Sequence, residues 1–154
     1  MTFIDGENYF GPVALSGGKA TYTTSSLPVG AHSIVAFYGG ATAYQQSYSK
    51  VDTQTVNKAA TTTALASSAN PSVKGQAVTF TATVTAVAPG KGTPTGTVTF
   101  KDGATVLGTA AVSGGKASLA TSSLAVGSHS MSATYNGSTS FLTGTSPVLT
   151  QTVS

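Results

Sequence analysis

Few side chains in this chain of 154 residues could do acid–base or metal chemistry. It has 2 His, 4 Asp or Glu and no Cys. From Thr61 onward Asp102 is the only acidic residue and His129 the only histidine. Hydrolysis of a glycoside usually needs two carboxylates, and a hydrolytic triad needs a nucleophile, a base and an orienting acid in mutual reach. The sequence therefore predicts no catalytic residues and a protein that is not an enzyme.

The two histidines, His32 and His129, could bind a metal or sense pH. Each stands near the start of a run with strand alternation, such as His129, Met131 and Ala133. In an extended array of domains the two rings would lie too far apart to share a zinc ion. We favour a structural interpretation, in which a ring N–H donates to a nearby carbonyl group. Because thiolate ligands are also absent, we expect no metal site and no cofactor.

Aromatic rings are the other side chains with a possible binding role, since they can stack on sugars or contact a protein. The first 57 residues hold eight of them: Phe3, Tyr9, Phe10, Tyr22, Phe37, Tyr38, Tyr44 and Tyr48. Among these, Phe37, Tyr44 and Tyr48 are the candidate ligand contacts. The alternative is that the surface here merely tolerates aromatic residues, and the absence of Trp weakens a sugar-binding interpretation.

The charge content narrows the classes of partner. Charged residues make up 7% of the chain, against about 25% in typical soluble domains. The net charge of +3 comes from seven basic residues, all Lys, spread singly along the sequence. A nucleic-acid-binding protein normally gathers Lys and Arg into a dense patch, so we expect no nucleic-acid partner. There is no apolar run of 18 residues, and we expect no membrane span.

The chain repeats itself at a constant offset of 97 residues. Residues 2–57 align with residues 99–154 without gaps, and about half of the positions are identical. For example, Ser-Gly-Gly-Lys-Ala occurs at 16–20 and again at 113–117. A fixed period marks an array of similar modules. In this alignment Phe37 and Tyr48 replace Thr134 and Thr145, so these two rings are specific to the first copy.

The repeat predicts two domains, a partial one at residues 1–58 and a complete one at 59–154. Nothing in the first copy corresponds to Thr61–Gly96, the first two strands and the loop that follows them. Two alternatives remain open: Met1 is the boundary of a fragment, or the first copy is an open sheet. An open sheet would dimerise, accept strands from a partner, or pack as an incomplete sandwich, because its core face and strand edges are exposed.

The local pattern is that of β-strands throughout. Val78, Phe80, Ala82 and Val84 alternate with threonines, and Thr is well suited to the wet face of a strand. Asp102-Gly103 and Gly114-Gly115 are typical of tight hairpin turns. The second copy has seven such strands, which begin near residues 61, 78, 97, 105, 117, 129 and 148. Seven short alternating strands in about 95 residues predict a two-sheet antiparallel sandwich of the immunoglobulin type.

Several motifs of the second copy resemble the group 3 bacterial Ig-like domains. These are Asn70-Pro71-Ser72, Gly75 to Phe80, Pro94 to Phe100, Gly127-Ser128-His129 with Ala133-Thr134-Tyr135, and Gln151-Thr152-Val153. The resemblance covers residues 61–154 in full and 1–57 as the later part of a module. Many such repeats have an acidic residue shortly after Tyr-x-Gly, where this chain has Ser138 and Ala41. A cation-binding role for that acid is therefore not expected here.

The resemblance implies a spacer or stalk module of a larger secreted or cell-surface bacterial protein, with neighbouring Ig-like repeats as its partners in the polypeptide. Self-association through the first copy is a further possible contact. The alternative function is adhesion, or binding of carbohydrate or protein, through the exposed aromatic residues of the first copy.

Overall fold

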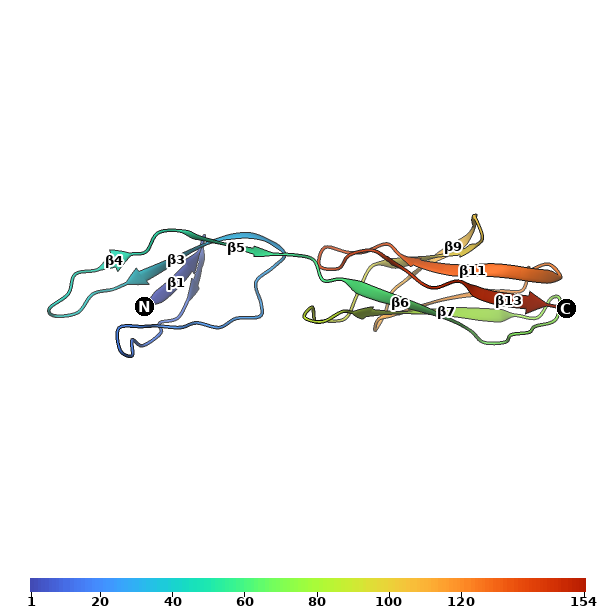
Figure 1. The fold of residues 1–154 in the computed structure, drawn as a ribbon, viewed down its shortest axis with the longest axis horizontal. Coiled ribbons are helices and arrows are strands. Elements are labelled where there is room, and N and C mark those ends of the chain that lie inside the picture. The colour runs from blue at the N-terminus through green and yellow to red at the C-terminus, as the bar shows by residue number, and fades with distance from the viewer. The chain divides into compact units, whose positions relative to one another are not determined.

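The computed structural model describes residues 1–154 and divides them into two compact units, Met1–Asn57 and Lys58–Ser154. We call them the N-terminal and the C-terminal unit (Figure 1). Lys58 lies in the C-terminal unit, where its Nζ donates a hydrogen bond to the Ser138 carbonyl oxygen, 2.7 Å away. All regular elements are strands, and no helix is present that could span a membrane.

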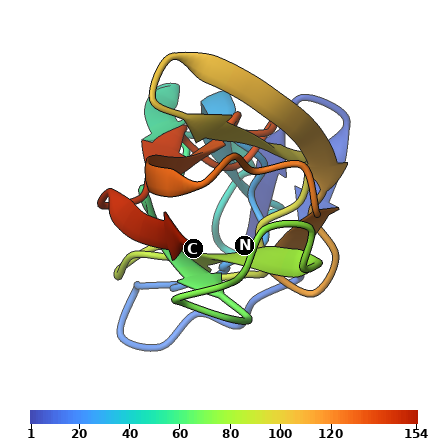
Figure 2. The same ribbon diagram turned by 90° about the vertical axis from the view of Figure 1, so that its right-hand side faces the viewer.

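The C-terminal unit is a sandwich of two antiparallel sheets. Its strands are β6 (Thr61–Ser67), β7 (Val78–Ala86), β8 (Thr97–Asp102), β9 (Thr105–Ala111), β10 (Lys116–Thr121), β11 (Gly127–Tyr135), β12 (Gly144–Thr145) and β13 (Leu149–Val153). One sheet has the order β10-β7-β6, and the other has the order β12-β11-β8-β9 with β13 also paired to β11. Figure 2 shows β6 and β7, in green, on one side and the gold to orange strands of the second sheet on the other. The predicted all-β sandwich fold is confirmed, and all seven predicted strands are present.

The core of the C-terminal unit consists of the inward-facing residues of both sheets. The strand alternation places Val78, Phe80, Ala82 and Val84 inward, and all four are buried. From the opposite sheet come Val98, Phe100, Met131, Ala133 and Tyr135, each fully buried. Phe141, for which the alternation predicts no inward position, is also buried. It lies in the loop before β12, where strand parity gives no information.

Glycine turns close two hairpins as expected. Gly114 and Gly115 both have positive φ, 57° and 77°, and connect the bridged residues Ser113 and Lys116. In the Asp102-Gly103 turn only Gly103 has a positive φ, 55°. The conformation therefore depends on Gly103 alone, and Asp102 is free to use its carboxylate elsewhere.

The N-terminal unit is a single five-stranded antiparallel sheet. Its strands are β1 (Thr2–Asp5), β2 (Asn8–Phe10), β3 (Gly30–Tyr38), β4 (Ser47–Tyr48) and β5 (Asp52–Val56). The order is β2-β1-β3-β4, and β5 also pairs with β3. By the offset of 97 residues these strands correspond to β8, β9, β11, β12 and β13. None of residues 1–57 is fully buried.

The segment 19–24 shows why the N-terminal unit has fewer strands. Its counterpart, β10, is a strand because it pairs with β7 over six residues, from Lys116 opposite Thr83 to Thr121 opposite Val78. The N-terminal unit has no counterpart of β7, and residues 19–24 form no strand. A strand requires a partner for its backbone groups, and here that partner is missing.

Candidate functional site

The three predicted ligand contacts lie on two different faces of the N-terminal sheet. Phe37 on β3 stands directly opposite Tyr48 on β4, and their ring centroids are 4.7 Å apart at an interplanar angle of 33°. Tyr44 instead lines a cavity of about 540 Å³ together with Tyr38. Because Phe37 and Tyr38 are neighbours on one strand, they point to opposite faces. The structure therefore brings Phe37 and Tyr48 together and separates Tyr44 from them.

The Phe37–Tyr48 pair is accessible from solvent. Tyr48 is 65% exposed, and Phe37 is half-buried. Tilted rings at this separation stabilise each other beyond the area that they bury. The pair thus presents a fixed apolar surface on the outer face of the sheet, where the C-terminal unit has Thr134 and Thr145 joined by their hydroxyls.

Tyr44 has a different environment. It is 72% exposed and closes a tight turn, in which Ala41 and Tyr44 exchange backbone hydrogen bonds of 2.8 and 3.0 Å. Its counterpart in the C-terminal unit is Phe141, which is buried in the core. The position of Tyr44 is therefore a core position of the sandwich that is left uncovered in the N-terminal unit.

The two histidines make the same contacts in both units. Nδ1 of His129 lies 2.6 Å from Oδ2 of Asp102, and Nε2 lies 2.8 Å from the Ala125 carbonyl oxygen. Nδ1 of His32 lies 2.6 Å from Oδ2 of Asp5, and its Nε2 lies 2.8 Å from the Pro28 carbonyl oxygen. The predicted tie to a nearby carbonyl is confirmed. The carboxylate partner was not predicted, although each Asp occurs at the same distance along the chain from its His.

This geometry favours the charged form of each ring. A carbonyl and a carboxylate both accept hydrogen bonds, so the ring satisfies both only when its two nitrogens carry protons. The hydrogen bond to the Ala125 carbonyl, followed by that to Asp102, raises the pKa of His129 above 6.5. The corresponding bonds to Pro28 and Asp5 raise the pKa of His32. Each histidine thus joins the loop before its strand to the turn of a hairpin, through one hydrogen bond to a carbonyl and one to a carboxylate.

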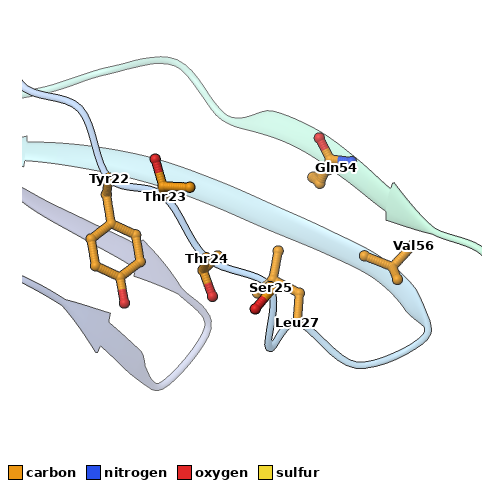
Figure 3. Close-up of a pocket in the computed structure, with 7 residues that line it drawn as sticks. All are labelled: Tyr22, Thr23, Thr24, Ser25, Leu27, Gln54 and Val56. Atoms are coloured by element: carbon orange, nitrogen blue, oxygen red, sulfur yellow. The ribbon is translucent and has the colours of Figure 1, made fainter. Parts of the chain in front are cut away.

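A cleft of mixed polarity lies on the inner face of the N-terminal sheet. It has a volume of about 450 Å³, and strand β5 and the coil at residues 22–27 form its sides. Figure 3 shows its lining, with Gln54 and Val56 on β5 and Tyr22 and its neighbours on the coil. Sequence reasoning did not predict this cleft, although the missing counterpart of residues 61–96 was its signal. No group of three or more His, Cys, Asp or Glu that could hold a metal ion is present.

The fold and these motifs agree with a comparison of the sequence with protein families. A model of the bacterial Ig-like domain (group 3) matches residues 1–57 and residues 65–154. The chain belongs to the group 3 bacterial Ig-like domains. This confirms the resemblance seen in the sequence motifs. Bacterial Ig-like domains are generally non-catalytic modules of larger proteins, and they are typically found in extracellular or surface proteins.

This bacterial Ig-like chain has weaker similarity to solved structures and none to curated proteins. Among solved structures, the fibronectin(III)-like modules of CbhA from Clostridium thermocellum are similar, with 22% sequence identity. That match covers 59% of this chain and 93% of the other, with a TM-score of 0.47. A search of curated proteins gave no match.

Proposed function

We propose that this chain is a non-catalytic spacer of a larger secreted or cell-surface bacterial protein, with neighbouring Ig-like repeats as its covalent partners. Membership of the group 3 bacterial Ig-like domains supports this function. The observation that carries the proposal is the way in which residues 70–74, which follow β6, are joined to residues 150–154 at the end of the C-terminal unit.

These segments are joined side by side by backbone hydrogen bonds in parallel orientation. The Ser72 N–H donates to the Thr152 carbonyl, and the Ser154 N–H donates to the Ser72 carbonyl, both at 2.9 Å. The Lys74 N–H donates to the Ser154 carbonyl at 2.8 Å. In a parallel pair these bonds are evenly spaced along the strands and slanted to them. A force along the strands therefore has to break them together.

The two ends of the C-terminal unit are placed so that a force pulling them apart acts on the bonds between residues 70–74 and 150–154. The chain enters near Ala59, whose N–H donates to the Ser140 carbonyl at 2.9 Å. It leaves at Ser154, and Figure 1 shows that β6 begins at one end of this unit and β13 ends at the other. Tension between neighbouring modules therefore shears the contact between residues 70–74 and 150–154. Such a joint suits a spacer that has to withstand tension between neighbouring modules.

Side-chain amides strengthen the same joint. Asn70 Nδ2 donates to the Thr150 carbonyl at 2.7 Å, and the Thr152 N–H donates to Asn70 Oδ1 at 3.0 Å. The buried Gln151 donates through Nε2 to the Ala69 carbonyl at 2.8 Å. Asn70 and Gln151 thus join the residues that follow β6 to the last strand, β13.

Pulling single molecules of the full chain tests this proposal. We expect the C-terminal unit to unfold in one step that releases about 30 nm, because an extended chain spans at most ~3.6 Å per residue. Asn70→Ala should lower the unfolding force. Asn136→Ala is the matched control, since Asn136 is also exposed and its Nδ2 makes two hydrogen bonds, to Thr97 and Thr99 on one neighbouring strand. Equal effects of the two variants would contradict the proposed role of the joint.

The paired rings of Phe37 and Tyr48 favour a second candidate function, adhesion or the binding of carbohydrate or protein. Binding to a glycan array or to cells should be lost in Phe37→Ala and in Tyr48→Ala. Tyr9→Ala is the control, because Tyr9 is 69% exposed and has no ring partner. Tyr44→Ala would show whether the inner face contributes. Absence of binding, or equal loss in Tyr9→Ala, would leave the spacer function alone.

A further inference from the structure

One margin of the C-terminal unit is formed by strand β9, which has a neighbouring strand on one side only (Figure 1). β9 is the last strand in the order β12-β11-β8-β9, and it pairs with β8 alone. The opposite margin of the sandwich is closed, because Ser72 forms a parallel bridge with Val153. The side chain of Leu119 on β10 lies against Gly108, but no backbone pairing joins β9 to β10. β9 therefore presents a free backbone edge.

The hydrogen bonds between β8 and β9 show which residues of this edge are free. The Val112 N–H donates to the Gly96 carbonyl at 2.8 Å. Because bonded pairs alternate along an antiparallel ladder, Ala110 also bonds to β8. The backbone groups of Thr109 and Ala111 consequently point away from β8. Both residues are exposed, and their backbone groups have no hydrogen-bond partner outside the ladder.

The corresponding edge of the N-terminal unit is blocked. Pro12 stands at the position of Thr109 and has no N–H to offer. The Val13 N–H next to it still donates to the Met1 carbonyl at 2.8 Å, so Pro12 costs no bond of the ladder. β2 (Asn8–Phe10) has three residues, whereas β9 has seven. Proline, charged side chains and a short length keep an edge strand from pairing with another chain, and β9 has none of these features.

We propose that β9 binds an extended, acidic segment of another protein as an added antiparallel strand. The N–H and C=O groups of Thr109 and Ala111 bond to the added strand, because an open sheet edge is a template for pairing. These backbone bonds supply affinity for any extended segment, and side chains at alternate positions supply preference. The surface lies wholly within the C-terminal unit, and it is independent of the proposed spacer function.

Charge favours an acidic segment over the β9 edge of a second copy. Residues 58–154 contain five lysines and one acidic residue, Asp102. The carboxylate of Asp102 is already bonded to His129. Two of the lysines lie beside the edge, since Lys101 on β8 pairs with β9 and Lys116 follows the tight turn after β9. An acidic strand is attracted by these lysines, whereas a second β9 edge brings the same positive charges.

Binding of a capped synthetic peptide to the full chain tests the proposal. The peptide is roughly nine residues long, within the usual length of a strand, with Val and Thr alternating in its centre and Glu at both ends. A matched peptide has Lys in place of each Glu. We expect one acidic peptide per chain by titration calorimetry, and at least about tenfold weaker binding of the Lys peptide. Hydrogen exchange at Thr109 and Ala111 should slow in the complex and stay unchanged in β2.

Thr109→Pro and Thr109→Val form a matched pair of variants. Both lose the hydroxyl that lies 3.3 Å from Thr99 Oγ1, but only proline removes the outward N–H. Thr109→Pro should weaken binding of the acidic peptide at least about tenfold, because an acceptor on the added strand loses its donor. Thr109→Val should change it by less than about twofold. Ala111→Pro removes the other outward N–H and should act as Thr109→Pro does.

The exchange measurement uses the unmodified chain, so it decides the question even if a proline variant fails to fold. Absence of binding, or binding without slower exchange at Thr109 and Ala111, would overturn the proposal. Equal binding of the Lys peptide would rule out an acidic partner, and equal binding by Thr109→Pro and Thr109→Val would rule out the β9 edge. A dimer of the unmodified chain in sedimentation, with Thr109 and Ala111 protected, would show that a second copy pairs with the edge instead.

Discussion

At the scale of single residues, the histidine–carboxylate pair is the same in both units. The side chains of His129 and Asp102 are 13% and 26% exposed, and those of His32 and Asp5 are 11% and 14% exposed. Asp102 also accepts a hydrogen bond from the Ser130 N–H at 3.1 Å, so its carboxylate joins the hairpin turn to β11. The histidine is therefore a structural residue whose protonation contributes to stability.

We predict that Asp102→Asn lowers the pKa of His129, because an amide removes the negative charge that favours the imidazolium ion. The pKa should still be held up in part by the Ala125 carbonyl, which is the larger cause of its rise. Proton NMR of the imidazole Cε1–H signals measures both histidines in one titration. His32 is the internal control, since its partner is Asp5. An equal shift of both histidines would contradict the assignment.

The raised pKa of His129 also predicts how stability depends on pH. A histidine whose pKa rises on folding stabilises the native state fully below its unfolded pKa, and this contribution is lost as the pH rises through the folded pKa. The free energy of unfolding of the C-terminal unit should therefore decrease as the pH increases above about 6.5. Urea unfolding at a series of pH values, followed by the amide signals of β11, measures this decrease. In His129→Gln the decrease should be smaller, and an unchanged slope would contradict the prediction.

Gln151 and Gln54 allow a matched comparison of one residue type. Gln151→Leu should destabilise the C-terminal unit by about 1–3 kcal/mol, because it leaves the half-buried Ser67 and Ala69 groups and the buried Ser72 hydroxyl with fewer partners. Gln54→Leu should change the stability of the chain by less than about 0.5 kcal/mol, because Gln54 is exposed. Urea unfolding of both variants tests this. Equal effects would mean that Gln54 is also enclosed.

At the scale of elements, the sequence predicts strands well where the local alternation and the partners agree. All seven strands predicted for the second copy are present, because the alternation of Val78 to Val84 and its counterparts determines which face is buried. The two-residue strand β12 is too short to show a period. The burial of Phe141 and the contact between His129 and Asp102 depend on how distant segments of the chain pack together. The alternation along a strand carries no information about such packing. The inner cleft of the N-terminal unit follows only from comparing the two copies.

The segments 19–24 and 116–121 show that the partner, and not the local sequence alone, decides whether a strand forms. We predict that amides of β10 that bond to β7 exchange with solvent on the order of 100-fold more slowly than their counterparts in residues 19–24, because exchange requires local opening. Hydrogen exchange followed by NMR compares pairs such as Ala117 with Ala20. Similar protection in both segments would mean that residues 19–24 are already paired in solution.

At the scale of the whole molecule, the two units share a sequence pattern but differ in what they bury. The C-terminal unit has a closed core, whereas the N-terminal unit has no fully buried residue. Burial of apolar surface is the main favourable contribution to folding. The free energy needed to open the chain should therefore be lower in residues 1–57 than in residues 58–154.

Limited digestion with trypsin measures this difference with a control built into the chain. Lys19 and Lys116 both occur in the sequence Ser-Gly-Gly-Lys-Ala, so the protease meets the same residues around each bond. Cleavage requires local unfolding, and Lys116 begins β10, which is paired along its length with β7. We expect cleavage after Lys19 well before cleavage after Lys116, with a resistant fragment that contains the C-terminal unit. Simultaneous cleavage at the two sites would show that the open face of residues 1–57 carries no cost in stability. A variant with residues 61–97 placed directly before Met1 would supply counterparts of β6 and β7, and protection of Lys19 in that variant would show that the cost comes from the uncovered inner face.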